Sequence, residues 1–546
     1  MSDPLILTLL FATPAWQSLA ADAGLEPEDC AAILDEASRL AEDILAPLGA
    51  TADAEGARLE NGRVILPDGH REAWRLMAEG GWLTADLDEN LGGMGLPTTL
   101  HVAASLGFEG AAMPFMMAAG ASRAGAHCLA EAAPDLARDW APRVASGDWA
   151  LTICISEPDA GSDVGRIRTK AEPSGEDWTV RGTKCWISFG DHDLTTRIGH
   201  LMLARTGAPE DGTRGLSLFL VPDRDEDGTR APITVERIEE KLGLHGSPTC
   251  VLSFDKAPAR MIGGPGEGLR QLFTMIELMR LQTSCQGAGV SLRAAALARR
   301  YAGERLQGGR PDAKPLPLTA HPDIRRQVAT LEAESAILTA AVLEAAATFD
   351  HARRGTEGAQ AKASWILPLV KTFGGETAFE TASGTVQVLS GAGYTREWPA
   401  ERYLRDARII TIYEGTTGMQ GQDFLMRRLL KDEGAGLKAF AEDAAAERAA
   451  LPPSPASDLA ETLIGRLEAL SDTIKTRDTR AQLYGADGYL RAGWLALSAQ
   501  MAARLAATGA QGAALAQVWG ATAEARMARA EAQALADPAP FDALFD

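Results

Sequence analysis

Glu414 is the residue whose position most directly suggests chemistry. It stands in "ARIITIYEGTTGMQGQDFLMRRLL" just ahead of a capping-box pattern, Thr417 followed three residues later by Gln420, which predicts a helix start at Thr416 or Thr417. A carboxylate in this entry turn has two explanations. It stabilises the positive end of the helix dipole by ~0.3 to 1 kcal/mol, or it is a base held at the edge of a site.

A second group of candidate residues follows the end of a predicted strand. In "ICISEPDAGSD" the strand stops at Ser156 and meets a turn that contains Asp159, Gly161, Ser162 and Asp163. Hydroxyls and unbonded backbone N–H groups are thereby directed at one place. Ordinary Asx and Ser turns contain the same residue types, so the turn by itself leaves a binding site and a plain turn equally open.

A third group lies in "GTKCWISFG", where Trp186 and Ser188 stand at the end of another predicted strand. An aromatic face and a hydroxyl two residues apart suit a planar cofactor. Taken alone, a tryptophan in this place is more often a core residue than a platform for a cofactor.

No metal site is expected. His245 in "KLGLHGSPTC" has no histidine, cysteine or aspartate at ligand spacing and is interpreted as a turn residue. The cysteines are scattered singly, which predicts reduced and mostly buried thiols: Cys30, Cys128, Cys154, Cys185, Cys250 and Cys285.

Segments of different periodicity must position these residues. Helical spacing gives way to a two-residue period at Leu151, Ile153 and Ile155, and "GLSLFLVP" and "TCVLSFD" add further short strands. Helices then return to the end of the chain. Because strands do not alternate with helices, a doubly wound α/β fold is disfavoured, and an α+β fold is predicted. The expected parts are an N-terminal helical domain (1–149), a central β-barrel-like domain (150–260), a C-terminal helical bundle (261–431) and an extra C-terminal helical segment (432–546).

Charge and composition limit the partners. Lys and Arg number 53 against 74 Asp and Glu, so the formal charge is -21 and a nucleic-acid backbone would be repelled. The N-terminal residues lack the basic charges of a signal peptide, and no apolar run approaches the ~20 residues of a membrane span. A cytoplasmic protein without a membrane span is expected.

Three of these stretches, together with "VQVLSGAGYTREWPAERYLRDARIITIYEGTT" and the order of helical and strand segments, resemble the acyl-CoA dehydrogenase family over about Gly92 to Leu430. Finer details, among them "RLENGRV", "GGMGLP" and the extra C-terminal helices, resemble the branch that acts on 3-methylmercaptopropionyl-CoA in dimethylsulfoniopropionate degradation.

The resemblance implies FAD as the cofactor. Trp186 would lie against the flavin ring and Ser188 would donate a hydrogen bond near its N5. Arg305 in "GERLQGGR" matches an arginine that contacts the FAD diphosphate of a neighbouring subunit, and Gln387 and Gly391 match positions that hold the adenosine half across the same boundary. A homodimer or homotetramer is therefore implied. The remaining assignments are Ile153, Ile155, Ser156 and Thr416 to the cofactor, and Ser162, Tyr413 and Gly415 to the acyl-CoA.

By the same resemblance, Glu414 is the catalytic base of an acyl-CoA dehydrogenase. It would take the α-proton while the β-hydride passes to flavin N5, and its own N–H with a flavin ribityl hydroxyl would hold the thioester oxygen. Ile412 and Tyr413 are the expected apolar surroundings that raise its pKa. In some relatives the acid comes from the first long helix of the bundle, where this chain offers Met279 and Arg280 instead.

Three matters stay open from the sequence. The acyl group is not fixed, and thioether, short straight-chain and branched thioesters are all compatible. The electron acceptor is expected to be an electron-transfer flavoprotein, with oxygen, as in an acyl-CoA oxidase, as the alternative. A DNA-binding or repair-associated protein of the same fold is the other alternative, which the acidic composition opposes.

Overall fold

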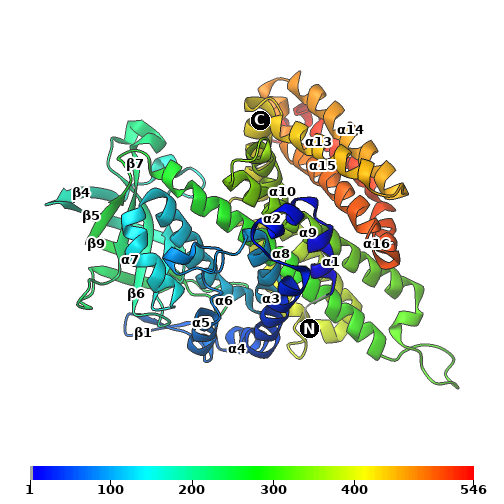
Figure 1. The fold of residues 1–546 in the computed structure, drawn as a ribbon, viewed down its shortest axis with the longest axis horizontal. Coiled ribbons are helices and arrows are strands. Elements are labelled where there is room, and N and C mark those ends of the chain that lie inside the picture. The colour runs from blue at the N-terminus through cyan, green and yellow to red at the C-terminus, as the bar shows by residue number, and fades with distance from the viewer. Residues whose placement is uncertain (1–3, 546) are drawn as a thin grey trace. The chain divides into compact units, whose positions relative to one another are not determined.

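The computed structural model describes residues 4–545 (Figure 1). The chain folds into two compact units. Unit 1 contains the chain up to Ser38, Pro97–Gly110 and the chain from Arg280 onwards, and unit 2 contains Arg39–Leu96 and Ala111–Met279. Helices dominate unit 1, and a β-sheet forms the centre of unit 2. The predicted α+β fold is confirmed.

The α-helices have these bounds: α1 (Pro4–Ala12), α2 (Pro14–Asp22), α3 (Pro27–Leu40), α4 (Ala46–Glu55), α5 (His70–Glu79), α6 (Thr98–Ala132), α7 (Pro134–Ala145), α8 (Gly268–Glu304), α9 (Pro322–Arg353), α10 (Ala359–Leu389), α11 (Ala400–Ala407), α12 (Thr417–Leu425), α13 (Ala435–Ala450), α14 (Pro455–Lys475), α15 (Thr479–Ala506), α16 (Ala510–Gly520), α17 (Ala523–Ala534) and α18 (Ala539–Asp542). The strands are β1 (Arg58–Glu60), β2 (Arg63–Ile65), β3 (Trp149–Cys154), β4 (Lys170–Ser174), β5 (Asp177–Ser188), β6 (Arg197–Arg205), β7 (Leu216–Pro222), β8 (Ile233–Ile238) and β9 (Thr249–Ile262).

The sheet of unit 2 closes on itself in the way the sequence predicts for a barrel-like domain. The pairing runs β6–β4–β5–β9–β7 and returns to β6, with β3 parallel to β6 and β8 antiparallel to β9. The predicted two-residue period of Leu151 and Ile153 falls on β3, where four of six residues are buried and Trp149 and Ile153 are half-buried. Closure removes most open edges, which would otherwise offer unpaired backbone groups.

A short hairpin within the N-terminal segment was not expected. β1 and β2 pair antiparallel through Asn61 and Gly62, both at positive φ. An Asn-Gly pair favours this two-residue turn because both residues tolerate the left-handed conformation. The N-terminal segment, expected as a helical domain, thus also contains a hairpin, for which "RLENGRV" carries the signal.

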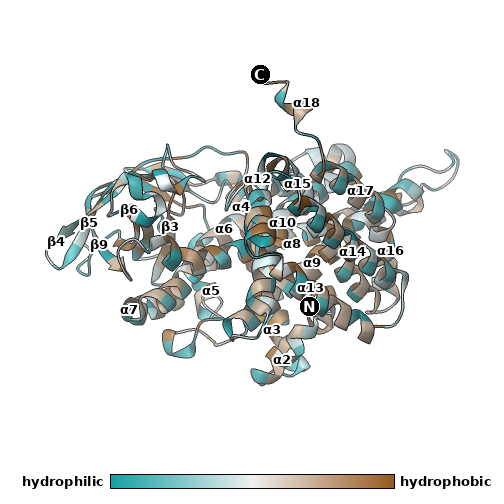
Figure 2. Ribbon diagram, turned by 90° about the horizontal axis from the view of Figure 1, so that it is seen from above, coloured by the Kyte–Doolittle hydropathy of each residue, from teal (hydrophilic) through white to brown (hydrophobic). Residues whose placement is uncertain are grey.

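The core of unit 1 consists of long helices that pack side by side. α10 packs against α9, and both contact α15; hydrophobic residues run along α8 and α10 (Figure 2). The C-terminal segment has an apolar stripe on α14, where Leu463, Leu467 and Leu470 are buried and Leu459 is half-buried. α13 packs against α10 and α16 against α9, so the C-terminal helices belong to the same unit as the bundle.

Among residues 4–545, one helix is long and apolar enough, by length and composition, to cross a membrane, contrary to the expectation that no apolar run approaches that length. This helix is α6, with a mean hydropathy of 1.3 over its most apolar window, and 94% of that window is buried inside the structure. The apolar residues of α6 are thus core residues. The helix leaves helical geometry at Ala112, two residues before Pro114, close to the point where the chain passes from one unit to the other.

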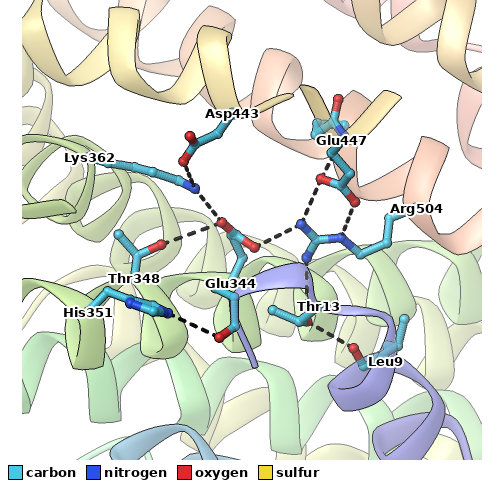
Figure 3. A network of polar contacts seen from close by, with 11 residues as sticks. Leu9, Thr13, Glu344, Thr348, His351, Lys362, Asp443, Glu447 and Arg504 are labelled. Atoms are coloured by element: carbon cyan, nitrogen blue, oxygen red, sulfur yellow. Dashed lines mark hydrogen bonds and ion pairs between the residues drawn. The ribbon is translucent and has the colours of Figure 1, made fainter. Parts of the chain in front are cut away.

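A buried network of charges joins the C-terminal helices to the bundle (Figure 3). Glu344 on α9 receives Lys362 of α10 at 2.8 Å and Arg504 of α15 at 2.8 Å. Arg504 also binds Glu447 of α13 at 2.7 Å, and Lys362 binds Asp443 at 2.6 Å. Burial would raise the pKa of Glu344, but Lys362 and Arg504 hold it well below its usual range. The network is stable only while each charge keeps its partners.

Replacing Arg504 by methionine is expected to destabilise unit 1 by about 3–5 kcal/mol, because Glu344 and Glu447 each lose a cationic partner in a buried place. Thermal unfolding should show a midpoint several degrees lower. The control is Arg326→Met, which removes an exposed ion pair with Asp323 on α9 and should cost at most about 1 kcal/mol. Equal midpoints for the two variants would contradict the role given to the network.

Candidate active site

Glu414 lies in a strained turn between two helical segments of unit 1. A 3-10 turn over Arg408–Thr411 follows α11, and the backbone then enters the left-handed region at Glu414, with φ of 54°, and at Gly415, with φ of 94°. The left-handed conformation is uncommon for a residue with a side chain and costs of order 1–3 kcal/mol. The turn therefore needs bonds that hold it in place.

Two side chains hold the carbonyl groups of this turn. The Gln420 amide donates to the Glu414 carbonyl at 2.8 Å, and the Lys371 ammonium donates to the Gly415 carbonyl at 2.6 Å. The predicted helix start at Thr416 or Thr417 is confirmed, with Thr416 as the N-cap of α12. The predicted capping box is wrong, because Gln420 binds the carbonyl of Glu414 and it is the Thr416 hydroxyl that accepts the Met419 N–H, at 3.5 Å.

Burial and two positive charges act on the pKa of the Glu414 carboxyl group in opposite directions. Burial raises its pKa from the ordinary value, while Arg280 and Lys371 act in the opposite direction. Ile412, expected among its apolar surroundings, is instead 45% exposed. Tyr413 does turn inward, since its hydroxyl donates to the Gln286 side chain. The result is a carboxylate with the raised pKa that a general base requires.

A buried carboxylic acid lies close to Tyr413. Glu109 on α6 accepts a hydrogen bond from the Gln282 amide at 2.8 Å, and burial raises its pKa to about 8. At neutral pH this acid is therefore largely protonated. Burial, followed by the fields of Glu109 and Glu414, raises the pKa of Tyr413 well above its ordinary value, so the phenol stays neutral.

The second group of predicted site residues meets within unit 2. The Cys185 N–H on β5 donates to the Ser156 carbonyl at 3.0 Å, which places the segment after β3 beside the strand that carries Trp186. The register of β5 against β9 shifts between Lys184 and Ile187. Trp186, inside this bulge, has φ of 64° and is 63% exposed. A bulge commonly turns a side chain in this way, and core packing of Trp186 is thereby excluded.

A buried ion pair fixes the segment after β3. Lys184 donates to the Ile155 carbonyl at 2.9 Å and to Glu157 at 2.8 Å. Glu157 also accepts the N–H groups of Arg168 and Thr169 at 2.7 and 3.0 Å. Burial favours the neutral acid, but Lys184 and these donors together lower the pKa of Glu157. The segment that begins at Ile155 is thus held by hydrogen bonds to the Ile155 carbonyl and to the Glu157 carboxylate.

These residues of unit 2 suit a planar aromatic ring. Trp186 offers an exposed indole, and Ser156 and Ser188 are half-buried hydroxyl residues, so an aromatic face and hydrogen-bonding groups are accessible together. Ile153 and Ile155 are likewise half-buried apolar residues. The donor set fits an isoalloxazine ring, with stacking on one residue and hydrogen bonds from others.

The remaining predicted residues lie at the surface. Arg305 directly follows α8, Gln387 lies near the end of α10, and Gly391 follows it in the 3-10 turn Ser390–Tyr394, all exposed in unit 1. A side chain at Gly391 would meet no atom within 4 Å. Ser162 is exposed in unit 2. The structure thus groups Tyr413, Gly415 and Thr416 with Glu414, and leaves these four residues outside that turn.

Sequence reasoning missed the charged residues beneath the turns. Lys371, Lys184, Glu157 and Glu109 were not singled out, although each carries a signal. Lys371 interrupts the apolar run "WILPLVKTF" of α10, and Glu109 interrupts an apolar stretch of α6. A lone charge on an apolar face is buried only with a partner. The partner, however, comes from another part of the chain.

A cavity of about 1120 Å³ lies elsewhere in unit 1 and contains none of the predicted site residues. Glu344, Lys362 and Arg504 line it. Because Glu344 already binds both Lys362 and Arg504, we assign no reaction to this cavity.

Replacing Lys184 by methionine is expected to leave Glu157 without its cation and to cost unit 2 about 3–5 kcal/mol. Hydrogen exchange at residues 155–157 and at Cys185 should accelerate. Arg181→Met on the same strand is the matched control, since Arg181 pairs with Asp255 at an exposed place and should cost at most about 1 kcal/mol. If the amides of the Lys184 variant exchange as slowly as those of this control, the Lys184–Glu157 ion pair does not hold the segment after β3.

Comparison with known proteins identifies the family of the chain. The chain matches the models of the acyl-CoA dehydrogenase N-terminal domain over residues 27–148, the middle domain over 152–257 and the C-terminal domain over 266–430. The bounds of the four domains expected from the sequence stay predictions.

Named relatives cover most of the chain. It is 36% identical to 3-methylmercaptopropionyl-CoA dehydrogenase of Ruegeria pomeroyi over 449 residues, which are 79% of this chain and 76% of that protein. It is 34% identical to a broad-specificity linear acyl-CoA dehydrogenase of Mycobacterium tuberculosis over 74% of this chain and 70% of that one.

The fold also resembles solved structures. The acyl-CoA dehydrogenase of Bacillus anthracis complexed with FAD superposes with a TM-score of 0.77 at 18% identity, covering 95% of this chain and 90% of that one. Both the sequence matches and the described fold point the same way: the chain belongs to the acyl-CoA dehydrogenase family, a family of FAD-dependent oxidoreductases.

Proposed function

We propose that the chain desaturates a short acyl-CoA thioester between its α- and β-carbons, with Glu414 as the base. The observation that carries the proposal is the Glu414 turn, which combines a carboxyl group of raised pKa with the left-handed backbone described above. A helix-stabilising carboxylate needs neither feature, because it acts best when exposed and ionised.

The turn offers two functional groups. The carboxylate takes the α-proton of the thioester. The N–H groups of Ile412 and Tyr413 donate to the Ile409 carbonyl, whereas the Glu414 N–H has no acceptor among residues 4–545. This N–H is proposed to donate to the thioester oxygen, where negative charge grows as the α-proton leaves. Losing one such donor typically costs about 2.7–4 kcal/mol of transition-state stabilisation.

Protonation of Glu414 is set by opposing effects. Burial makes the carboxylate a stronger base, and the positive charges of Arg280 and Lys371 keep enough of it ionised. Arg280 stands in the helix from which some relatives supply the acid. In this chain that position carries a cation that supports Glu414.

FAD, when bound, supplies the acceptor for the β-hydride. On the protein side, Trp186 is proposed to stack on the ring, Ser188 to donate to its edge, and Ser156 and the half-buried Ile153 and Ile155 to border it.

The remaining surface residues are proposed to serve the FAD of another chain. Arg305, Gln387 and Gly391 are exposed, which suits contacts across a subunit boundary, in a homodimer or homotetramer. Thr416 is proposed to contact the cofactor, and Ser162 and Gly415 the acyl-CoA.

For the substrate, we propose a short thioester such as 3-methylmercaptopropionyl-CoA, supported by the relative from Ruegeria pomeroyi. Straight-chain thioesters are the competing class, supported by the relative from Mycobacterium tuberculosis. Anaerobic turnover across a panel of both classes ranks them by kcat/KM. An electron-transfer flavoprotein is the proposed electron acceptor. Rapid reoxidation of the reduced flavin by oxygen alone would instead indicate an acyl-CoA oxidase.

The variant Glu414→Gln should keep its FAD and lose at least about a thousandfold in the rate of flavin bleaching by acyl-CoA, toward the upper end of what one base contributes. In the wild type the rate should rise with pH through the raised pKa of Glu414, because only the ionised form takes the proton.

The matched control is Glu433→Gln. Glu433 also has a positive φ, 57°, and also precedes a glycine, but it is exposed. It should bleach at the wild-type rate. A Glu414 variant within tenfold of the wild type would contradict the assignment.

Trp186→Ala should fold with a stability within about 0.5 kcal/mol of the wild type, because the side chain is mostly exposed. Its Kd for FAD should rise about tenfold, in line with the loss of an aromatic stacking partner, worth about 0.5–1.5 kcal/mol beyond its buried area. Titration of the apoprotein measures this. Phe545→Ala, at an aromatic residue that is 90% exposed, should not change the Kd, and an unchanged Kd in Trp186→Ala would refute the stacking role.

A further inference from the structure

Lys371 is a fully buried lysine that the family chemistry outlined above does not require. It lies in the middle of α10 within the apolar run "WILPLVKTF", with no exposed surface. Burying an ammonium group without partners is strongly unfavourable. Its position therefore depends on the groups that it meets.

The groups that Lys371 meets belong to the Glu414 turn. Its Nζ donates to the Gly415 carbonyl at 2.6 Å and to the Ile410 carbonyl at 3.2 Å. These acceptors stand on either side of Glu414 in the chain. Hydrogen bonds from an ionised donor are short and about twice as strong as neutral ones. One side chain thus ties both ends of the strained turn to α10.

The close approach of α10 to this turn has a visible cause. At Gly375, one turn after Lys371, an added Cβ would lie 2.9 Å from the Ile410 carbonyl carbon and 2.9 Å from the Thr411 nitrogen. Only glycine lets the two backbones come so near. The helix is thereby close enough for the Lys371 ammonium to reach carbonyl groups rather than water.

We propose that Lys371 is the positioning residue of the base: it fixes the direction of the Glu414 N–H and carboxylate by holding the carbonyls of Ile410 and Gly415, and its charge keeps Glu414 ionised. The proposal rests on the proposed function of Glu414. Lys371 acts through the turn, and it is not assigned a contact with substrate or cofactor.

Charge supports the same role. Burial lowers the pKa of Lys371 to about 8, while the field of Glu414 raises it and that of Arg280 on α8 lowers it. On the side facing α15, the nearest carboxylate of α10, Glu376, is already bound to Arg491 at 2.7 Å. Among these groups, Glu414 is the anion whose pKa responds to Lys371.

The sign of the effect follows. A cation near a carboxylate favours its ionised form, so removing Lys371 raises the pKa of Glu414 and moves the acid limb of proton abstraction to higher pH. In the wild type, Lys371 itself loses its charge near pH 8, which should give a second change on the alkaline side that neutral variants lack.

The test measures proton abstraction separately from hydride transfer. The wild-type holoenzyme is incubated in deuterated buffer with an acyl-CoA thioester that has α-hydrogens but none on its β-carbon, and α-deuterium uptake is followed by mass spectrometry across pH. Lys371→Met should shift the acid limb upward by about one unit and lower the plateau rate at least tenfold. Lys371→Gln, also neutral, should give the same shift, and Lys371→Arg should restore the wild-type limb.

The matched control is Lys362→Met, the same substitution of a buried lysine on the same helix, about two and a half turns earlier. Lys362 binds Glu344 and Asp443, so its loss should lower the unfolding midpoint and leave the pH profile unchanged. If both neutral Lys371 variants keep the wild-type limb and plateau, with at most a lower midpoint, Lys371 is only structural and the proposal is overturned.

Failure of the proposed function has a different signature. If wild type and Glu414→Gln take up deuterium equally, or if neither does, Glu414 is not the base. If the wild type exchanges and Glu414→Gln does not, the profiles of the Lys371 variants alone decide the inference.

Discussion

The site of this protein depends on the burial of charge. Glu414 and Lys371 lie within a helical unit whose core is otherwise apolar, and the energy of each depends on the other. A carboxylate buried alone would become protonated, and an ammonium buried alone would lose its proton. In the proposed mechanism, burial raises the pKa of Glu414 and makes it a stronger base, while Arg280 and Lys371 favour its ionised form.

The same principle recurs at two other places in the chain. Lys184 and Glu157 hold the segment that carries Ser156 in unit 2, and Arg504 with Glu344 joins the C-terminal helices to the bundle in unit 1. In each case a buried pair connects segments far apart in sequence. Such pairs add little net stability compared with apolar packing, but they specify one arrangement because mismatched charges are costly.

The sequence predicted the fold class and the barrel-like sheet because local patterns determine them, such as the two-residue period in β3. It predicted the start of α12 at Thr416 or Thr417 but placed the capping pattern on Thr417, whereas Thr416 is the N-cap. It did not predict the hairpin at Asn61 and Gly62, although the turn signal was present. It also misplaced the partner of Gln420, since the positive φ of Glu414, which turns its carbonyl toward that amide, cannot be read from residue types.

The buried charges beneath the turns were missed for a related reason. Lys371 is recognisable as a misfit on an apolar helix face, but its acceptors at Ile410 and Gly415 lie about forty residues away, and only the folded chain brings them together. Exposure was equally hidden, because the bulge that turns Trp186 outward results from a register shift against β9. The resemblance assigned a role to Trp186 and none to Lys371, whose contacts become visible only in the folded chain.

The most direct measurement of the central claim is the pH dependence of a single anaerobic turnover, followed by the loss of the oxidised flavin absorbance when acyl-CoA is mixed with the holoenzyme. The account predicts bleaching with formation of the α,β-unsaturated thioester, and an acid limb whose apparent pKa lies above the value of about 4.3 of free glutamate. A rate independent of pH across that range, or no bleaching by any acyl-CoA, would contradict a buried glutamate as the base.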